Sequence, residues 1–408
     1  MSFSLSPDQL LDISRQMRSD LATGLSSDEA DLLCIPTFIP RTWPPSAGKS
    51  LAVDMGGTNA RCAVVSLDED RRFRIDDGPI KERIPLNRGV SMNRERFLAF
   101  LSRLIRQLSP PRGLPVGFCF SYPARPAPDG DAVILNWTKE LFVENTVGEK
   151  VGGMLLGYLE KNDPGLIADG IFVINDTVAT LLAGMASARA DKYIGLIAGT
   201  GTNMAILLPQ ERVSKIKGDV PLKSVIPINM ESGNFNPPHL TDYDRALDAS
   251  SSNPSRHCFE KAVSGMYLPY LFKLACPKSS LDPVQGSGPL FDMAYAVSGR
   301  YTENYADVES FLARQIIERS AAMIAGALAG VIAFLSEPHV SASICITAEG
   351  GLFYAHPRYR EIVSSTLDML LRELDRDRVR FEIRSVTHAN LLGCAIAGLS
   401  SDKDRRIS

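Results

Sequence analysis

Two short stretches of this chain are nearly identical in pattern. One reads Val53-Asp54-Met55-Gly56-Gly57-Thr58-Asn59, and the other reads Ile197-Ala198-Gly199-Thr200-Gly201-Thr202-Asn203. Each passes from an apolar run through glycine and threonine into a second apolar run, which predicts a β-hairpin. Glycine lets backbone N–H groups approach a ligand closely, and threonine adds a hydroxyl donor. Two such turns facing each other would bind a polyphosphate from both sides, so the repeat predicts a nucleotide held between two related lobes.

The length and charge of the chain limit the possible classes of protein. At 408 residues it exceeds the size at which one core usually keeps growing, so we expect two domains. The net charge of −3 gives no reason to expect nucleic acid or a membrane surface as a partner. The seven cysteines are scattered and never spaced C-x-x-C, which favours a reducing compartment over a disulfide framework or zinc site. With no signal peptide visible, we expect a cytoplasmic protein.

One apolar segment could be read in two ways. Residues 320–336 contain no charged side chain. A membrane-spanning helix needs about 20 predominantly apolar residues. This segment is shorter and rich in alanine and glycine, so we expect a helix buried between layers, with a membrane helix as the alternative.

Helical and strand patterns alternate along the chain, which is typical of an α/β protein. An N-terminal helix should begin at the capping box Ser6-Pro7-Asp8-Gln9. Because a hairpin opens each half, the sheets should be mixed. We further expect helices at 97–108, 177–188, 306–335 and 358–374, strands at 116–120, 171–174 and 343–347, a linker at 36–49 and a surface loop within 242–253.

Two polar segments are candidates for chemistry. Asp176 lies where a strand gives way to a helix, which is a common position for a ligand site in α/β sheets. Aspartate is also a favoured N-cap, so Asp176 could simply cap the helix. A phosphate-binding protein nevertheless needs a base near its acceptor hydroxyl. The segment Asn136-Trp137-Thr138-Lys139 could bind a ligand or form a surface strand with an extended lysine.

Taken together and in this order, the motifs resemble those of the hexokinase family from about residue 50 to residue 400. The residues that carry the resemblance are Asp54-Met55-Gly56-Gly57-Thr58-Asn59 with Arg61 and Gly199-Thr200-Gly201-Thr202-Asn203 for the two phosphate motifs, Phe120-Ser121-Tyr122-Pro123 and Asn136-Trp137-Thr138-Lys139 for the sugar segments, Asn175-Asp176-Thr177-Val178-Ala179-Thr180 for the catalytic segment, and Glu349-Gly350-Gly351 with His356-Pro357 for the adenosine segment.

The resemblance implies an α/β protein with the two-lobed actin-like ATPase fold, a duplicated ribonuclease H-like fold with mixed sheets, flanking helices and a cleft between the lobes. The small lobe would hold residues 48–174 and 390–408, and the large lobe residues 1–47 and 175–389. The resemblance also implies ATP, Mg²⁺ and phosphoryl transfer to the 6-hydroxyl of a hexose. The sequence has no G-x-x-x-x-G-K-[ST] motif, so it is not a P-loop enzyme.

The same resemblance implies a role for each matching residue. Asp176 would accept the proton of the 6-hydroxyl, Lys139 would assist catalysis, and Mg²⁺ would reach Asp54 and Asp176 through water. The sugar would contact Ser121, Thr138, Lys139, Asn175, Asp176, Asn203, Glu231, Ser232 and Tyr270. ATP would contact Asp54, Gly56, Gly57, Thr58, Asn59, Arg61, Thr200, Gly201, Thr202, Gly350 and Gly351.

Two departures from the family pattern bear on the sugar. Glucose-specific members read Glu-Trp-Gly where this chain has Glu231-Ser232-Gly233, and they carry a second glutamate near the C1/C2 edge of the sugar. Aligning residues 265–270 with that region puts Tyr270 there. More room and less carboxylate at C2 would suit an N-acetyl group, whose methyl could pack on the aromatic ring. We therefore expect an N-acetylglucosamine kinase, with glucose phosphorylation as the alternative.

A third departure is Ala389-Asn390-Leu391-Leu392-Gly393, where the family usually has a Gly-Ser-Gly turn. This puts in doubt how the nucleotide end of the site is contacted.

A catalytically silent sugar sensor with the same fold is an alternative of another class. The presence of Asp54, Lys139, Asp176 and Thr200 favours an enzyme instead. The sequence does not distinguish a monomer from a dimer.

Overall fold

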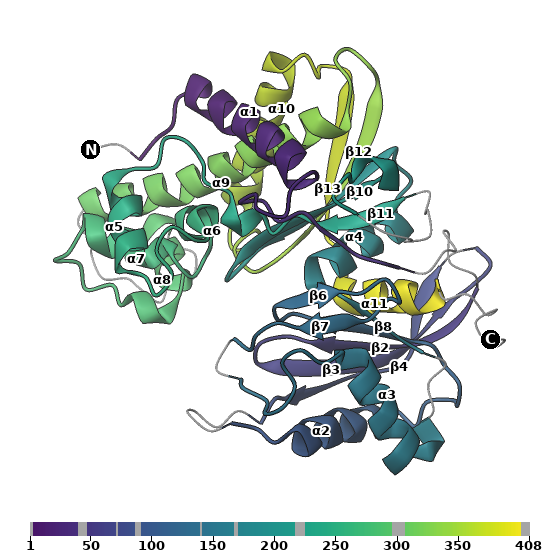
Figure 1. Cartoon of the computed structure of the whole chain (residues 1–408). Coiled ribbons are helices and arrows are strands. Elements are labelled where there is room, and N and C mark those ends of the chain that lie inside the picture. Colours follow the sequence, from purple (N-terminus) through teal and green to yellow (C-terminus); the bar gives the residue numbers. More distant parts are fainter. Residues whose placement is uncertain are drawn as a thin grey trace.

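Two mixed sheets, each flanked by helices, form two lobes (Figure 1). The computed structural model describes residues 3–39, 47–70, 72–85, 91–138, 141–166, 170–216, 225–295 and 307–400. The lower lobe in Figure 1 contains a five-stranded sheet, and the upper lobe contains a six-stranded sheet. The expected α/β architecture with mixed sheets is therefore observed.

The small lobe is built on a sheet of order β4-β3-β2-β5-β8. Strands β2, β3 and β4 are antiparallel neighbours, whereas β5 and β8 join in parallel. Alternate residues of β2 face opposite sides, with Leu51, Val53 and Met55 against the α2 and α3 side and Ala52 against α11. The elements of this lobe are β2 (Gly48–Met55), β3 (Asn59–Leu67), β4 (Phe73–Arg83), α2 (Arg94–Arg106), β5 (Val116–Phe120), β6 (Ala124–Pro126), β7 (Ala132–Ile134), α3 (Val151–Asn162), β8 (Ile171–Ile174) and α11 (Ala389–Leu399).

The large lobe is built on a sheet of order β1-β11-β10-β9-β12-β13. Strand β12 pairs in parallel with both β9 and β13, and the remaining pairs are antiparallel. The elements of this lobe are α1 (Pro7–Gly24), β1 (Ile35–Pro36), α4 (Asp176–Ser187), β9 (Lys192–Ala198), β10 (Thr202–Leu208), β11 (Ile226–Asn229), α5 (Asp242–Ser250), α6 (Cys258–Val263), α7 (Leu268–Ala275), α8 (Gly288–Tyr295), α9 (Asp307–Leu335), β12 (Ala342–Glu349), α10 (Pro357–Glu373) and β13 (Val379–Arg384).

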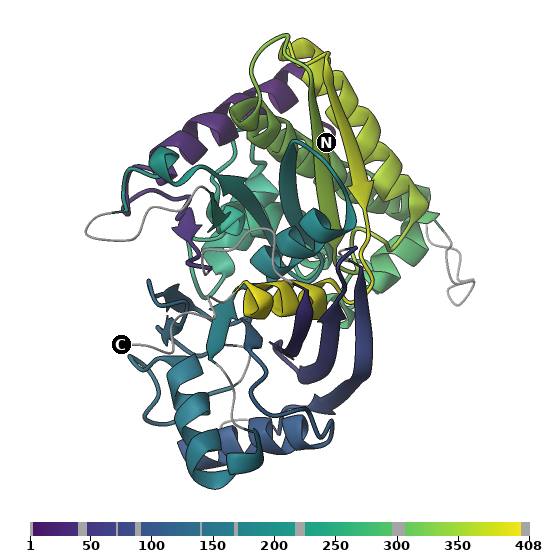
Figure 2. The same cartoon turned by 90° about the vertical axis from the view of Figure 1, so that its right-hand side faces the viewer.

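Helices α4 and α11 lie between the two sheets (Figures 1 and 2). They pack against each other, and their small and aliphatic side chains share one core with residues of β2, β3 and β10. Ala179 and Leu182 from α4 meet Leu391 and Ala395 from α11 in this core. The end of the chain therefore returns to the small lobe, and α4 begins at the junction of the two sheets.

The apolar segment expected to be a buried helix forms part of α9. This helix is long and apolar enough to cross a membrane by length and composition alone, but 89% of its most apolar window is buried inside the structure. It packs against α1 and α10 in the core of the large lobe. The capping box of α1 is also as expected, since Gln9 N–H donates to Ser6 Oγ and Ser6 N–H donates to Gln9 Oε1.

One sequence expectation is wrong in this part of the fold, and another is only partly covered by the described residues. The polar stretch 242–253 contains helix α5, which begins with a capping box between Thr241 and Asp244. Asp244 is buried and accepts two hydrogen bonds from the buried Arg319 of α9, at 3.1 and 2.7 Å. The expected linker at 36–49 overlaps β1 and β2 at its ends, and its residues 40–46 lie outside the described residues.

Candidate active site

The first glycine turn connects β2 to β3 as expected. Asp54 and Arg61 face each other across the hairpin, and the turn is closed by a 3.0 Å hydrogen bond from Gly56 N–H to the carbonyl oxygen of Asn59. Tyr122 O–H donates to the Gly56 carbonyl at 3.1 Å. Thr58 is exposed at the tip, so its hydroxyl and the backbone of the turn can meet a ligand.

The second glycine turn connects β9 to β10. Thr200 is exposed at its tip, whereas the buried Thr202 donates its hydroxyl to the Ile197 carbonyl at 3.1 Å and so stabilises the turn itself. Gly350 lies directly against this turn with a φ of 114°. A Cβ on Gly350 would lie 2.3 Å from the Ala198 carbonyl oxygen, so only glycine fits. The two predicted ATP segments, 199–202 and 350–351, are therefore in contact.

Asp176 is the first residue of α4 and is separated from the end of β8 by Asn175 alone. The N-cap of this helix is Asn175, whose side-chain oxygen accepts the Thr177 N–H at 2.8 Å. The same N–H lies 2.8 Å from Asp176 Oδ1. Because Asn175 already caps the helix, capping alone does not explain the carboxylate of Asp176.

Asp54 and Asp176 belong to one electrostatic environment. Burial raises the pKa of the Asp54 carboxyl, Arg61 opposes that increase, and nearby Asp176 adds to it. Arg61 Nε donates to Asp54 Oδ2 at 2.9 Å, and Asn390 Nδ2 donates to Oδ1 at 3.5 Å. Asn390 belongs to the segment that departs from the family pattern, and the structure places it beside Asp54.

Two carboxylates that influence each other electrostatically can accommodate a divalent cation. No cluster of three or more acidic, histidine or cysteine side chains suited to a metal occurs among the described residues. A cation held by Asp54 and Asp176 would therefore complete its coordination with water and phosphate oxygens. This donor set fits Mg²⁺, which usually keeps several waters beside one or two carboxylates.

An aromatic cluster of Phe97, Phe120, Tyr122 and Trp137 holds together the two segments that the family resemblance assigns to the sugar. The Trp137 ring packs edge-on to all three others, with centroid distances of 5.1 to 5.7 Å. Its Nε1 donates to Thr146 Oγ1 at 2.8 Å. Ser121 directly follows the buried Phe120, and Thr138 directly follows the buried Trp137. The packing of the cluster therefore positions both residues. Lys139 lies outside the described residues, so its catalytic role stays a prediction.

A hydrogen-bond chain joins the second turn to Glu231. Asn203 Nδ2 donates to Asn229 Oδ1 at 2.8 Å, and Asn229 Nδ2 donates to Glu231 Oε1 at 2.7 Å. The oxygen of Asn203 accepts the Met204 and Ser232 N–H groups at 2.8 and 3.0 Å. Asn203 therefore stabilises the Glu231 loop, where Glu231 itself has a left-handed backbone with φ of 53°.

Glu231 also lies in the electrostatic environment of Asp176. Burial raises the pKa of the Glu231 carboxyl, the Asn229 hydrogen bond lowers it, and Asp176 raises it further. The charge of Asp176 thus influences the carboxyl groups of both Asp54 and Glu231. These carboxylates come from the small lobe, from the start of α4 and from the large lobe, which places the base candidate between the two halves.

The expected roles of Ser232 and Tyr270 at the sugar need correction. Ser232 is fully buried, and its Oγ has no hydrogen-bond partner among the described residues, so replacing tryptophan by serine does not expose a hydroxyl to a ligand. Tyr270 instead lines a cavity beside Gly199 and Thr200, together with Met266. The position of Tyr270 therefore does not support the expectation that fewer carboxylates lie near C2 of the sugar than in glucose-specific members.

Glu260 on α6 was missed by the sequence analysis. Its Oε2 accepts the Thr202 N–H at 3.1 Å, and it contributes to the electrostatic environment of Glu231. A Cβ on Gly201 would lie 2.5 Å from Glu260 Oε2, so a larger residue there would displace this carboxylate from the turn. The available signal was a carboxylate that directly follows Phe259 and precedes Ala262 and Val263.

His257 precedes α6 and is a second residue that was missed. Its backbone is left-handed with φ of 54°, and the half-buried ring lies beside Gly233, where a Cβ would be 3.6 Å from His257 Nδ1. Burial lowers the pKa of the His257 imidazole, and Glu231 opposes that decrease. The large-lobe wall near Asp176 therefore presents Glu231, Glu260 and an imidazole.

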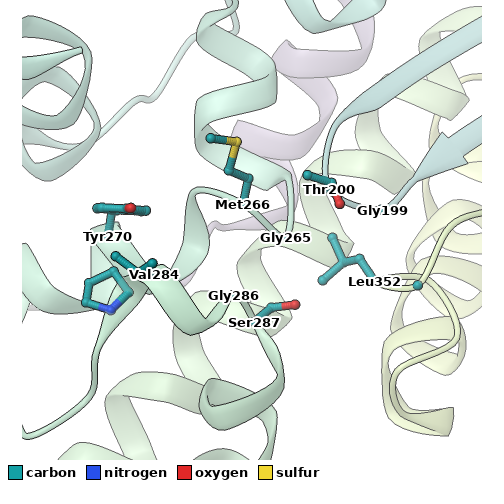
Figure 3. A pocket seen from close by; sticks show the side chains of 11 residues that line it. Gly199, Thr200, Gly265, Met266, Tyr270, Val284, Gly286, Ser287 and Leu352 are labelled. Carbon is teal, nitrogen blue, oxygen red and sulfur yellow. The ribbon is translucent and has the colours of Figure 1, made fainter. Parts of the chain in front are cut away.

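A cavity of about 460 Å³ lies next to the second turn (Figure 3). Gly199, Thr200 and Leu352 border it on one side, and Tyr270 lines another part of its wall. Gly351 also lines the cavity. Its volume falls in the range typical of small-molecule sites. Because the two segments expected to bind ATP border this cavity, it is the candidate site for the nucleoside part of a nucleotide.

The comparisons with known proteins agree with this arrangement. Two family models, both described as Hexokinase, match residues 1–186 and residues 193–291 with 288–400. The structure of hexokinase from Schistosoma mansoni complexed with glucose superposes with a TM-score of 0.77 at 22% identity, covering 98% of this chain and 96% of that one. This likeness establishes the two-lobed actin-like ATPase fold that the motifs imply.

Two curated relatives extend the comparison. Hexokinase of Kluyveromyces lactis is 30% identical over 90% of this chain and 83% of its own length. Hexokinase-1 of Saccharomyces cerevisiae is 30% identical over 67% of this chain, and the match spans 58% of that relative. With family models matching both halves, a matching fold and relatives at this identity, the chain belongs to the hexokinase family.

Proposed function

We propose that this protein transfers the γ-phosphoryl group of ATP to the 6-hydroxyl of a hexose, with glucose as the preferred sugar. The observation that carries the proposal is the position of Asp176 at the start of α4, where its charge influences both Asp54 and Glu231. A base at the lobe junction, near a phosphate turn and a carboxylate for hydroxyl recognition, is what such a transfer requires.

In the proposed reaction, Asp176 accepts the proton of the 6-hydroxyl and orients its oxygen toward the terminal phosphorus. Thr58 and Thr200, exposed at the tips of the two turns, hold the phosphate groups with the neighbouring backbone. Asp54 and Asp176 would hold Mg²⁺ through water, and the ion would supply positive charge to neutralise the phosphates. Ser121, Thr138, Asn175 and Lys139 complete the sugar site as the family resemblance implies. Most of the rate then comes from positioning and electrostatic stabilisation.

The carboxylates near the sugar support glucose over N-acetylglucosamine. Glu231 and Glu260 are close enough to influence each other electrostatically, so two acceptors are available for hydroxyl groups. A charge-assisted hydrogen bond contributes about 1.5–3 kcal/mol, which a substituent lacking the hydroxyl would forfeit. The structure of hexokinase from Schistosoma mansoni, which has the same fold, is complexed with glucose. N-acetylglucosamine remains the second candidate, because the family's tryptophan is replaced by Ser232.

The reactive groups also support an enzyme over a silent sensor, since Asp54, Asp176 and Thr200 are all in place. The seven cysteines are free thiols, which supports a reducing, cytoplasmic location. The oligomeric state is proposed only as monomer or dimer.

Steady-state kinetics with ATP and Mg²⁺ test the proposal. We expect kcat/KM to be highest for glucose, lower for mannose and lowest for N-acetylglucosamine, with the 6-phosphate identified by NMR. A preference for N-acetylglucosamine would overturn the glucose assignment but retain the reaction. Sugar binding without phosphorylation of any hexose would support the sensor instead.

A further inference from the structure

The cavity beside the second turn has two distinct ends. Thr200 and Leu352 lie on one side, and Tyr270 and Val284 lie opposite them, with Met266 and Ser287 between (Figure 3). The proposed function places the phosphates at the Thr200 end. The nucleobase then lies toward Tyr270, and the inference below rests on that proposed function.

The Tyr270 end of the cavity is uncharged and largely apolar. None of the residues that line the cavity carries a charged side chain. Met266, Tyr270 and Val284 are large apolar or aromatic side chains that stay 49%, 37% and 80% exposed. Exposed apolar groups that gather at a cavity are typical of a ligand-binding surface. An aromatic ring at the surface offers a flat face to a heterocyclic base.

The backbone donors around this end are already used within the protein. Gly265 N–H donates to the Gly199 carbonyl at 2.8 Å, and Met266 N–H donates to the Thr200 carbonyl at 3.2 Å. Val284 N–H donates to Asp282 Oδ1 at 3.1 Å, and Gly286 N–H donates to the Pro283 carbonyl at 3.1 Å. These N–H groups therefore do not read the hydrogen-bonding edge of a base.

We propose that Tyr270 determines nucleotide recognition by stacking its ring on the base, with apolar contacts from Met266 and Val284. Because the protein contacts the face of the base and makes few hydrogen bonds to its edge, it accepts guanine as well as adenine nucleoside triphosphates. Apolar pockets discriminate between similar ligands by only about 10- to 200-fold, whereas pockets that hydrogen-bond a distinguishing group reach about 10⁴-fold.

Calorimetric titration with the Mg²⁺ complex of the non-hydrolysable ATP analogue AMPPNP tests the role of Tyr270. Base stacking on an aromatic side chain corresponds to a loss of roughly 5- to 150-fold in affinity on substitution by alanine. Tyr270→Ala should weaken AMPPNP binding by that factor, and Tyr270→Phe should bind within about twofold of the unmodified protein. Leu274→Ala is the matched control, because Leu274 lies one turn further along α7, is equally exposed at 37% and does not line the cavity.

A second titration compares AMPPNP with its guanine counterpart, GMPPNP. A ratio of dissociation constants below about 200 supports stacking as the main determinant, and a larger ratio overturns it. Unchanged AMPPNP affinity in Tyr270→Ala also overturns the inference, even if hexoses are phosphorylated normally. Conversely, loss of binding in Tyr270→Ala in a protein that phosphorylates no hexose would retain the inference and reject the proposed function. Thermal melting of each variant confirms that it is folded.

Discussion

Glu260 accepts a 3.1 Å hydrogen bond from the backbone N–H of Thr202, so a carboxylate from α6 is bound directly to the second glycine turn. The same carboxylate influences Glu231 electrostatically. One residue therefore connects the turn assigned to phosphate with the wall assigned to the sugar. A sugar that contacts Glu260 would be positioned relative to the nucleotide by this hydrogen bond.

Replacing Glu260 by glutamine should weaken sugar recognition without disturbing the turn. The amide oxygen can still accept the Thr202 N–H, but the charge that strengthens a hydrogen bond to a sugar hydroxyl is lost. We expect KM for glucose to rise about 10- to 100-fold, with a much smaller change in KM for ATP. The exposed Glu160→Gln on α3 is the control. Equal rises in both KM values would show that Glu260 acts only on the turn.

Gly350→Ala should destabilise the large lobe. An alanine there must adopt a φ of 114° and place its Cβ 2.3 Å from the Ala198 carbonyl oxygen. Backbone strain and overpacking together should cost about 2–5 kcal/mol in the free energy of unfolding. The adjacent Gly351→Ala is the control, because no atom lies within 4 Å of its added Cβ. Denaturant unfolding measures both, and similar losses in the two variants would contradict the close contact.

Arg319→Met should also reduce stability, because it leaves the carboxylate of Asp244 buried without its ion-pair partner. Breaking a buried pair from one side costs about 3–5 kcal/mol in the free energy of unfolding. The pair of Arg245 and Asp242 on the surface of α5 gives the contrast, since both side chains are largely exposed. We expect Arg245→Met to cost at most about 1 kcal/mol. A neutral Arg319→Met would show that the ion pair does not stabilise the contact between α5 and α9.

Sugar recognition should weaken at acidic pH. Burial raises the pKa of Glu231 above its ordinary value of 4.5, despite the Asn229 hydrogen bond and nearby His257, while Asp176 and Glu260 add to the increase. As pH falls through this raised pKa, the carboxylate becomes protonated and loses its charge as an acceptor. The ratio kcat/KM for the sugar, which reports the free enzyme, should therefore fall on the acidic side with a midpoint above 4.5.

The Glu231→Gln variant separates this titration from that of other carboxylates. Its kcat/KM should be lower at neutral pH and should lose the acidic limb assigned to Glu231. An unchanged limb in the variant, or a midpoint at or below 4.5 in the unmodified protein, would assign the titration to another group.

Local patterns were sufficient to predict the parts of the site that depend on short segments. The two hairpins and the strand-to-helix junction at Asp176 follow from glycine turns, apolar runs and helix-start signals. Residues brought in by tertiary packing were not predictable in this way. Glu260 reaches the turn only because α6 packs against the segment 232–234, a contact with no local signature.

The errors have similar physical causes. Tyr270 was placed at the sugar from its order in the chain, but the path of α7 puts it in the neighbouring cavity. The polar composition of residues 242–253 favours a loop, although the capping-box spacing of Thr241 and Asp244 indicates the helix α5 that the structure shows. A polar composition indicates that a segment is exposed to solvent, whereas the spacing of capping residues indicates that its backbone begins a helix.

The most direct test of the account is the turnover of Asp176→Asn with saturating glucose, ATP and Mg²⁺. Removing the general base while keeping the shape of the side chain should lower kcat by about 10²–10⁴-fold, with glucose still bound and the protein still folded. The exposed Asp70→Asn on the small lobe is the matched control and should retain full activity. Turnover in Asp176→Asn within a few-fold of the unmodified protein would contradict the assignment of Asp176 as the base.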